Sequence, residues 1–125
     1  MDFDANKPIY LQIVDNIKDR IINGDYSPGE KLPSVRDFAA QMAVNPNTMQ
    51  RALAQLESEG LIYTERTNGR FVSQDNNTIK VTKDEQARSI TKKYVGKMRS
   101  LHYSLQEITK LVNDTYSSEQ KEEQK

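Results

Sequence analysis

Isoleucine at every fourth position gives the start of the chain a helical period. The four residues are Ile9, Ile13, Ile17 and Ile21. One apolar face over about four turns predicts an amphipathic helix. Pro8 suits its first turn, after Asn6 or Lys7 as the cap. Gly24 suits the position just past its last turn, so the pattern predicts that the helix ends there.

A second helix is predicted after a turn and a short extended piece. The turn is SPGEKLP, residues 27–33, in which Leu32 is the apolar contact. Ser34 and Asp37 then fit the S-x-x-D/E capping box, whose side chains satisfy backbone N–H groups of the first turn. The helix is expected over about 35–42. Its inward residues are expected to be Val35, Phe38, Ala39 and Met42.

A third helix begins with polar, uncharged residues after a short turn at Ala43 and Val44. Asn45 is a favourable cap, and Pro46 takes the first helical position, where its missing N–H costs nothing. Gly60 fits the position just after the last turn. The apolar side of this helix is expected to consist of Met49, Ala52, Leu53 and Leu56.

Beyond Gly60, the stretch LIYTERTNGRFVS, residues 61–73, changes to β character. Asn68-Gly69 is a strong hairpin signal, with strands expected near 62–65 and 70–73. Two helices joined by a tight turn and followed by a hairpin form a winged helix-turn-helix. The fold class is therefore mainly α with a small β-hairpin, and the winged domain takes up residues 1–75. Its core is expected to include Ile13, Ile17, Phe38, Leu53, Leu56, Ile62 and Phe71.

The rest of the chain is predicted to be helical. Residues 82–85, TKDE, fit a capping box that opens a helix reaching about Ser100, and residues 104–107, SLQE, fit another. The second box implies that the chain breaks near 101–103 and restarts. The two helices take up 76–116, and the polar tail 117–125 is expected to be disordered.

One continuous coiled coil is the competing interpretation of this region. Apolar residues from Met98 to Val112 keep a 3-4 spacing across the predicted break. Two helices are preferred, because the cap lies inside the pattern and two heptads are too short to indicate a coiled coil.

The composition excludes several classes of site. The 125 residues contain no Cys and one His, which excludes disulfides, a Cys nucleophile and a metal site built on several imidazoles of one chain. His102 is expected to be a turn residue. The hydrophobic fraction is 35% and the mean hydropathy is −0.83, so the core is thin and a second chain is expected to add buried area. No membrane span or signal peptide is predicted, so a cytoplasmic location is expected.

Net charge alone does not indicate a nucleic-acid partner. Residues 1–75 hold 8 Lys and Arg against 11 Asp and Glu, a net charge of −3, and residues 76–125 hold 10 against 7, a net charge of +3. Neither half is strongly basic, so a few well-placed basic residues would have to provide any DNA binding. The sequence contains no phosphate loop or pocket-like carboxylate pair, so we expect no enzyme, cofactor or metal site.

The order of residues around the third helix resembles a known family. KLPSVRDFAAQMAVNPNTMQRALAQLESEGLIYTERTNGRFVS is similar to the winged helix-turn-helix of GntR-type transcription regulators. FDANKPIYLQIVDNIKDRIINGDYSPGEKLPS is similar to the family's opening helix and loop, so the resemblance covers about residues 3–73. The short C-terminal region, about 79–116, resembles the YtrA-like subfamily. That resemblance implies a homodimeric regulator, often a repressor of ABC transporter operons, whose C-terminal helices form the dimerisation region.

The polar start of the third helix suits DNA. A recognition helix presents its first turns to base edges in the major groove, where amides and hydroxyls find partners. The resemblance implies DNA contacts by Arg36 and Thr48. Gln50 stands where many members have a base-reading arginine, which predicts adenine instead of guanine at that base. The expected contacts from this part of the chain are Arg36, Asn45, Asn47, Thr48, Gln50 and Arg51.

The hairpin is expected to contribute a second set of DNA contacts. Asn68 and Gly69 would let the backbone approach the minor groove, and Arg66 and Arg70 flank them. With Lys31, Arg36 and Arg51, these arginines could form one local basic face. The expected partner is a double-stranded operator with an inverted repeat.

The C-terminal helices are expected to bind a second copy of the chain. Two short helices cannot bury all their apolar residues alone, and the expected interface consists of Tyr94, Met98, Leu101, Leu105, Ile108 and Val112. A small-molecule effector would have to bind at this interface or near residues 78–82. The alternative function is a winged-helix protein-interaction module without sequence-specific DNA binding, which the acidic charge of residues 1–75 favours.

Overall fold

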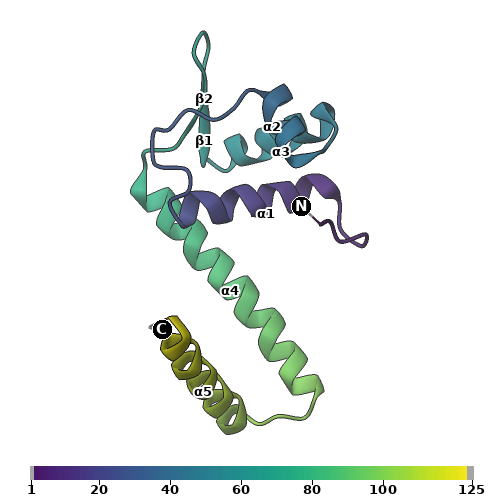
Figure 1. The fold of residues 1–125 in the computed structure, drawn as a ribbon, viewed down its shortest axis with the longest axis vertical. Helices are drawn as coiled ribbons and strands as arrows, with labels where there is room; N and C mark the ends of the chain where they lie inside the picture. Colours follow the sequence, from purple (N-terminus) through teal and green to yellow (C-terminus); the bar gives the residue numbers. More distant parts are fainter. Residues whose placement is uncertain (1, 124–125) are drawn as a thin grey trace. The chain divides into compact units, whose positions relative to one another are not determined.

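The computed structural model describes residues 2–123. These residues form five helices and one antiparallel hairpin (Figure 1). The elements are α1 (Ile9–Ile22), α2 (Val35–Met42), α3 (Pro46–Ser58), β1 (Ile62–Glu65), β2 (Gly69–Val72), α4 (Asn76–Ser100) and α5 (Leu105–Glu123). The mainly α fold with a small hairpin is therefore confirmed. The chain divides into two compact units, Met1–Asp84 and Glu85–Lys125.

The core of the first unit lies between three helices and the base of the hairpin. α1 and α2 both pack against α3, and α3 also packs against β1. Figure 1 shows α1 lying along one side of α2 and α3, with the hairpin beside them. The largest fully buried side chains are Phe38, Ile13, Ile17, Met49, Leu53, Leu56, Leu61, Ile62 and Val72. Burying one such side chain stabilises the fold by about 1.5–3 kcal/mol, so this cluster holds α3 in place.

Ile9, from the predicted apolar face of the first helix, and Phe71, from the predicted core, lie partly outside this cluster. Ile9 is 45% exposed, whereas Val14, which lies outside the i+4 pattern, is 2% exposed. A spacing of four residues advances about 40° beyond a full turn at each step, so the ends of a long i+4 run rotate off one face. Phe71 is half-buried and stacks on Tyr63 with their ring centroids 5.6 Å apart.

The ends of α2 and α3 follow the sequence prediction. Ser34 Oγ accepts a hydrogen bond from the backbone N–H of Asp37 at 3.2 Å. Asn45 Oδ1 accepts from the backbone N–H of Asn47 at 2.8 Å, with Pro46 at the first helical position. The turn between the helices is tight, because Ala43 adopts a left-handed backbone with φ of 56°. Together these contacts fix where α3 starts.

The start of α1 differs from the prediction. Pro8 is its cap residue, without a side-chain hydrogen bond, so neither Asn6 nor Lys7 caps the helix. The Gln12 side chain from the first turn instead binds the segment that precedes the helix. Its oxygen accepts from the backbone N–H of Asp4 at 2.7 Å, and its amide donates to the carbonyl of Lys7 at 3.0 Å.

The hairpin loop is one residue shorter than the expected strands left for it, because Gly69 belongs to β2. Glu65 pairs with Gly69, so residues 66–68 form a three-residue loop and Gly69 begins β2. The backbone N–H of Asn68 donates to the carbonyl of Glu65 at 3.1 Å, and Gly69 follows with φ of 106°. A turn followed by a glycine at positive φ is the usual form of a three-residue hairpin loop.

The turn before α2 attaches to the hairpin. Lys31 bridges to Phe71, and the backbone N–H of Leu32 donates to the carbonyl of Arg70 at 2.9 Å. Leu32 is buried, as predicted. This contact fixes the hairpin beside the start of α2.

α4 begins earlier than the capping box at 82–85 predicted. Asp75 caps it, and its carboxylate accepts from the Thr78 hydroxyl at 3.0 Å and from the backbone N–H of Asn77 at 2.9 Å. Thr82 lies inside the helix, is buried, and donates to the carbonyl of Thr78 at 2.9 Å. Ile79 packs against the core. The first turns of α4 therefore belong to the first unit, whereas the sequence suggested a boundary at 75.

The second unit contains the predicted break between two helices. Ser104 Oγ accepts from the backbone N–H of Glu107 at 3.2 Å, and Glu107 Oε1 accepts from the backbone N–H of Ser104 at 3.0 Å. His102, with φ of 65°, lies in the turn before this box, and Figure 1 shows the chain reversing there. A single continuous coiled coil is thus wrong. α5 also runs through 117–123, which we expected to be disordered, while residues 124–125 lie outside the described part.

Candidate nucleic-acid interface

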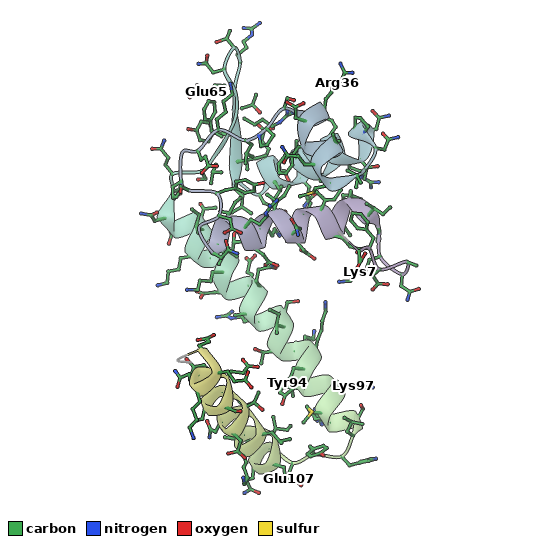
Figure 2. The ribbon with its side chains drawn as sticks, viewed as in Figure 1. Lys7, Arg36, Glu65, Tyr94, Lys97 and Glu107 are labelled. Atoms are coloured by element: carbon green, nitrogen blue, oxygen red, sulfur yellow. The ribbon has the colours of Figure 1, made fainter. Side chains whose placement is uncertain are left out.

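The start of α3 brings most of the predicted helix residues to the surface. Asn47, Gln50 and Arg51 are exposed, and Thr48 is half-buried. Arg36 is exposed on α2, and Figure 2 shows it projecting away from that helix. Several free backbone N–H groups at a helix start attract anions such as phosphate. This surface can therefore bind nucleic acid through hydrogen bonds without any titrating group.

Asn45 is already occupied inside the protein. Its side-chain oxygen caps α3 through the backbone N–H of Asn47. The Asn45 amide NH₂ keeps both its donors for a partner, while one lone pair of its oxygen is used by the cap. The structure therefore gives Asn45 a folding role, and a DNA contact by it stays a prediction.

Arg51 packs toward α1. Its guanidinium carbon lies 3.8 Å from the centroid of the Tyr10 ring, a cation–π contact. Pro8, Thr48 and these two residues line a shallow pocket of about 390 Å³. The sequence analysis did not include Tyr10 in the site, because nothing in the local pattern joins residues 10 and 51.

An ion pair fixes the far end of α3. Lys18 Nζ of α1 lies 2.9 Å from Glu59 Oε1, and their side chains are 12% and 33% exposed. Such a pair contributes modest stability. The ion pair ties the end of α3 to α1, and the Asn45 cap fixes the start of the same helix, so both ends of α3 are held in place.

The tip of the hairpin carries three of the predicted wing residues. Arg66, Asn68 and Gly69 are exposed. Asn68 Nδ2 donates to Glu65 Oε2 at 3.1 Å, so part of its side chain stabilises the loop (Glu65 is labelled in Figure 2). Gly69 has φ of 106°, a backbone conformation that other residues rarely adopt, which explains the glycine here beside the Lys31 side chain.

Arg70 lies differently from the other wing residues. It is half-buried, and its Nη2 donates to Gln50 Oε1 on α3 at 3.5 Å. Its Nε is buried without a hydrogen-bond partner. The structure thus joins the hairpin to the recognition helix, a contact that sequence spacing could not indicate.

Lys31 and Arg70 also line a groove between the hairpin and the start of α2. The groove has a volume of about 590 Å³, and Ser34, Asp37 and Asn68 contribute to its walls. Two basic side chains and a helix start make it suitable for an anion. The groove brings together two of the five residues of the expected basic face, Lys31 and Arg70, and the face as a whole stays a prediction.

Residues 2–123 contain neither a metal-binding cluster nor a membrane-spanning helix. No group of three or more His, Cys, Asp or Glu side chains could hold a metal ion. None of the helices in these residues is long and apolar enough to cross a membrane.

A helix-turn-helix with an exposed polar recognition helix and a wing defines a DNA-binding domain. The sequence pattern of the family described as "Bacterial regulatory proteins, gntR family" matches residues 9–72. The chain belongs to this family, and it is a DNA-binding transcription regulator of the YtrA-like type.

Two curated relatives cover much of the chain. It is 39% identical to the uncharacterized HTH-type transcriptional regulator YhcF of Bacillus subtilis over 106 residues, which are 85% of this chain and 88% of that protein. It is 42% identical to the HTH-type transcriptional repressor YtrA of the same organism over 77 residues, 62% of this chain and 59% of that protein. The expected YtrA-like resemblance is therefore confirmed.

Solved structures support the same assignment. A GntR family transcriptional regulator from Listeria monocytogenes superposes with a TM-score of 0.83 at 38% identity, covering 90% of this chain and 98% of that chain. YtrA from Sulfolobus acidocaldarius gives a TM-score of 0.53 at 28% identity, covering 94% and 96%. AraR(DBD) in complex with operator ORR3 gives 0.52 at 29% identity, covering 58% and 88%.

Proposed function

We propose that this regulator is a homodimeric repressor that binds an inverted-repeat operator, with α3 in the major groove and the hairpin on the flanking minor groove or backbone. The observation that carries the proposal is the exposed polar start of α3 beside the basic hairpin. The similarity to AraR(DBD), a protein whose structure was solved with an operator, supports this docking.

We propose that a second copy of the chain binds the apolar surface of the second unit. Leu101, Leu105 and Val112 of the expected interface are 52%, 79% and 47% exposed, and Tyr94 is 38% exposed. Ile108 is already buried inside the unit at 7% exposure. A shallow apolar groove of about 380 Å³ lies on this surface, between Tyr94 of α4 and Val112 of α5.

Further apolar residues extend this surface beyond the predicted set. Ile90 and Tyr116 are 68% and 66% exposed. Large exposed apolar patches mark interaction surfaces, and a dimer would cover this patch while presenting two recognition helices to DNA. In such dimers the two half-sites lie about one helical turn, or a multiple of it, apart along the duplex.

The direction and target of regulation follow from relatives. Repression is proposed because the YtrA relative is named a repressor. An ABC transporter operon is the target that the subfamily resemblance suggests. A protein with this role would act on DNA in the cytoplasm.

The alternative is a winged-helix module that binds a protein through the same surface. The net charge of −3 over residues 1–75 favours it, because bulk charge would repel the duplex. Binding to DNA would then be weak and equal for all sequences.

The test is selection of bound duplexes from a random library at about 0.15 M salt, where distant charge attraction is screened. We expect a twofold-symmetric motif, and specific sites bound roughly 10³-fold or more tighter than random DNA. Arg36→Gln should weaken binding to every sequence, while Lys121→Gln, an equal change of charge on α5, should not. Folded wild-type protein that enriches no motif would contradict the proposal and favour the alternative.

A further inference from the structure

The contact between Arg70 and Gln50 bears on which base the recognition helix can read. The two residues are 20 positions apart in the sequence, and Arg70 Nη2 donates to Gln50 Oε1 at 3.5 Å. One comes from β2 and the other from α3. The wing and the recognition helix therefore form one composite surface at this point.

The chemistry of the pair fixes the orientation of the Gln50 amide. A guanidinium has five N–H donors and no acceptor, whereas an amide has an oxygen acceptor and an NH₂ donor. In this contact Gln50 turns its oxygen toward Arg70, and its NH₂ points away from Arg70. A hydrogen bond to a charged donor is stronger than one between neutral groups, so this orientation is favoured over the reverse.

The position of Arg70 is itself fixed by the hairpin. Arg70 pairs with Thr64 across the two strands, and the backbone carbonyl of Arg70 accepts a hydrogen bond from the backbone N–H of Leu32 at 2.9 Å. Its side chain is half-buried, with Nε shielded from solvent and without a partner. The guanidinium therefore approaches Gln50 from an anchored strand.

We infer that Arg70 and Gln50 read one base pair together and that they select guanine over adenine. This inference rests on the proposed docking of α3 in the major groove, and it places Arg70 of β2 there beside Gln50, while the hairpin loop at residues 66–68 reaches the flanking minor groove or backbone. Guanine presents two acceptors there, N7 and O6, whereas adenine presents the N7 acceptor and the N6 donor. A free glutamine matches adenine with both amide atoms. With its oxygen turned toward Arg70, the pair presents mainly N–H groups to the base, which match guanine and oppose the adenine N6 group.

This inference reverses the base that Gln50 alone predicts, and Arg70 becomes a specificity-determining residue. Removing the guanidinium should free Gln50 Oε1 and restore its preference for adenine. The change of preferred base is a sharper readout than a loss of affinity, because a merely structural role for Arg70 would weaken both duplexes alike.

The experiment is selection of bound duplexes by wild-type protein and by Arg70→Met, which keeps an unbranched apolar side chain and loses every donor. The base read by Gln50 is the one whose preference disappears in Gln50→Ala. At that base we expect guanine for the wild type and adenine for Arg70→Met, with a change in the ratio of roughly tenfold or more. Arg66→Met is the matched control and should change affinity but not the preferred base.

Adenine at that base in the wild type would overturn the inference. A wild-type motif that Gln50→Ala leaves unchanged would also overturn it, and so would guanine retained by folded Arg70→Met. Thermal melting reports whether the variant folds. If Arg70→Met does not fold, the affinity of the wild-type protein is measured for two operator duplexes, one with G·C and one with A·T at that base. Binding to A·T as tight as to G·C overturns the inference without any variant. A wild-type protein that enriches no motif at all contradicts the proposed function instead.

Discussion

Asn45 allows the folding role and the DNA role of the recognition helix to be separated. Its side chain caps α3 through the backbone N–H of Asn47 at 2.8 Å. Replacing such a cap by Ala costs about 1 kcal/mol. In a domain of 60–100 residues, that loss lowers the melting temperature by roughly 4–8 °C. Asn45→Ala is therefore expected to melt lower than the wild type by this amount, at equal protein concentration.

Asn45→Asp tests the second role. Aspartate is an equally good cap and favours the positive end of the helix dipole, so the melting temperature should stay or rise. The added negative charge, however, would face phosphate if this end of α3 meets DNA. We expect operator binding weakened by tenfold or more, an order of magnitude that corresponds to about 1.4 kcal/mol.

Calorimetry gives the melting temperatures, and fluorescence anisotropy with a labelled operator gives the affinities. An unchanged melting temperature in Asn45→Ala would refute the capping role. Wild-type affinity in Asn45→Asp would refute the placement of the α3 start against phosphate.

Two further predictions concern α4 and α5. Hydrogen bonds from the Thr78 hydroxyl and then from backbone N–H groups of Thr78 and Asn77 lower the pKa of Asp75, and bonds from the Ser104 N–H and then from its hydroxyl lower the pKa of Glu107. Because both pKa values are lowered on folding, this stability is present above the ordinary carboxyl range and is lost as pH falls below about 4. Asp75→Asn should make the melting temperature less dependent on pH in that range, and an unchanged dependence would count against the cap. Leu105→Glu should shift the dimer to monomer in sedimentation equilibrium, because Leu105 is 79% exposed on the proposed interface, and a dimer of wild-type strength would exclude that surface.

Local signals predicted the parts of the fold that depend on neighbouring residues. Ser34 and Asn45 lie next to the helices that they cap, so α2 and the start of α3 could be predicted closely. The break before Ser104 could be predicted for the same reason, because both partners of its capping box lie within four residues.

The start of α4 was missed because two local signals competed. Thr82 fits a capping box, but a threonine hydroxyl inside a helix can instead donate to the carbonyl four residues earlier, as it does to Thr78. Asp75 provides the actual cap, ahead of two asparagines that are poor helix formers. Packing of Ile79 against the core outweighs that local preference.

The composition of the candidate site was predictable, but its internal connections were not. The polar start of α3 and the basic hairpin follow from the sequence. The contacts of Arg70 with Gln50 and of Arg51 with Tyr10 join residues far apart in the chain. Only the fold brings these pairs together, and they decide which donors remain available to a partner.

The three-residue loop of the hairpin differs from the start of α3 in how freely it can change. Residues 66–68 are exposed, while the buried hairpin residues Ile62 and Val72 lie at the opposite end of the strands. Exposed loop tips tolerate substitution and insertion. Asn45, in contrast, has to keep a capping side chain. Evolution can therefore vary Arg66 and Thr67 at little cost to folding. Mutations at Asn68, which bonds Glu65, and at Asn45 are also under selection for stability.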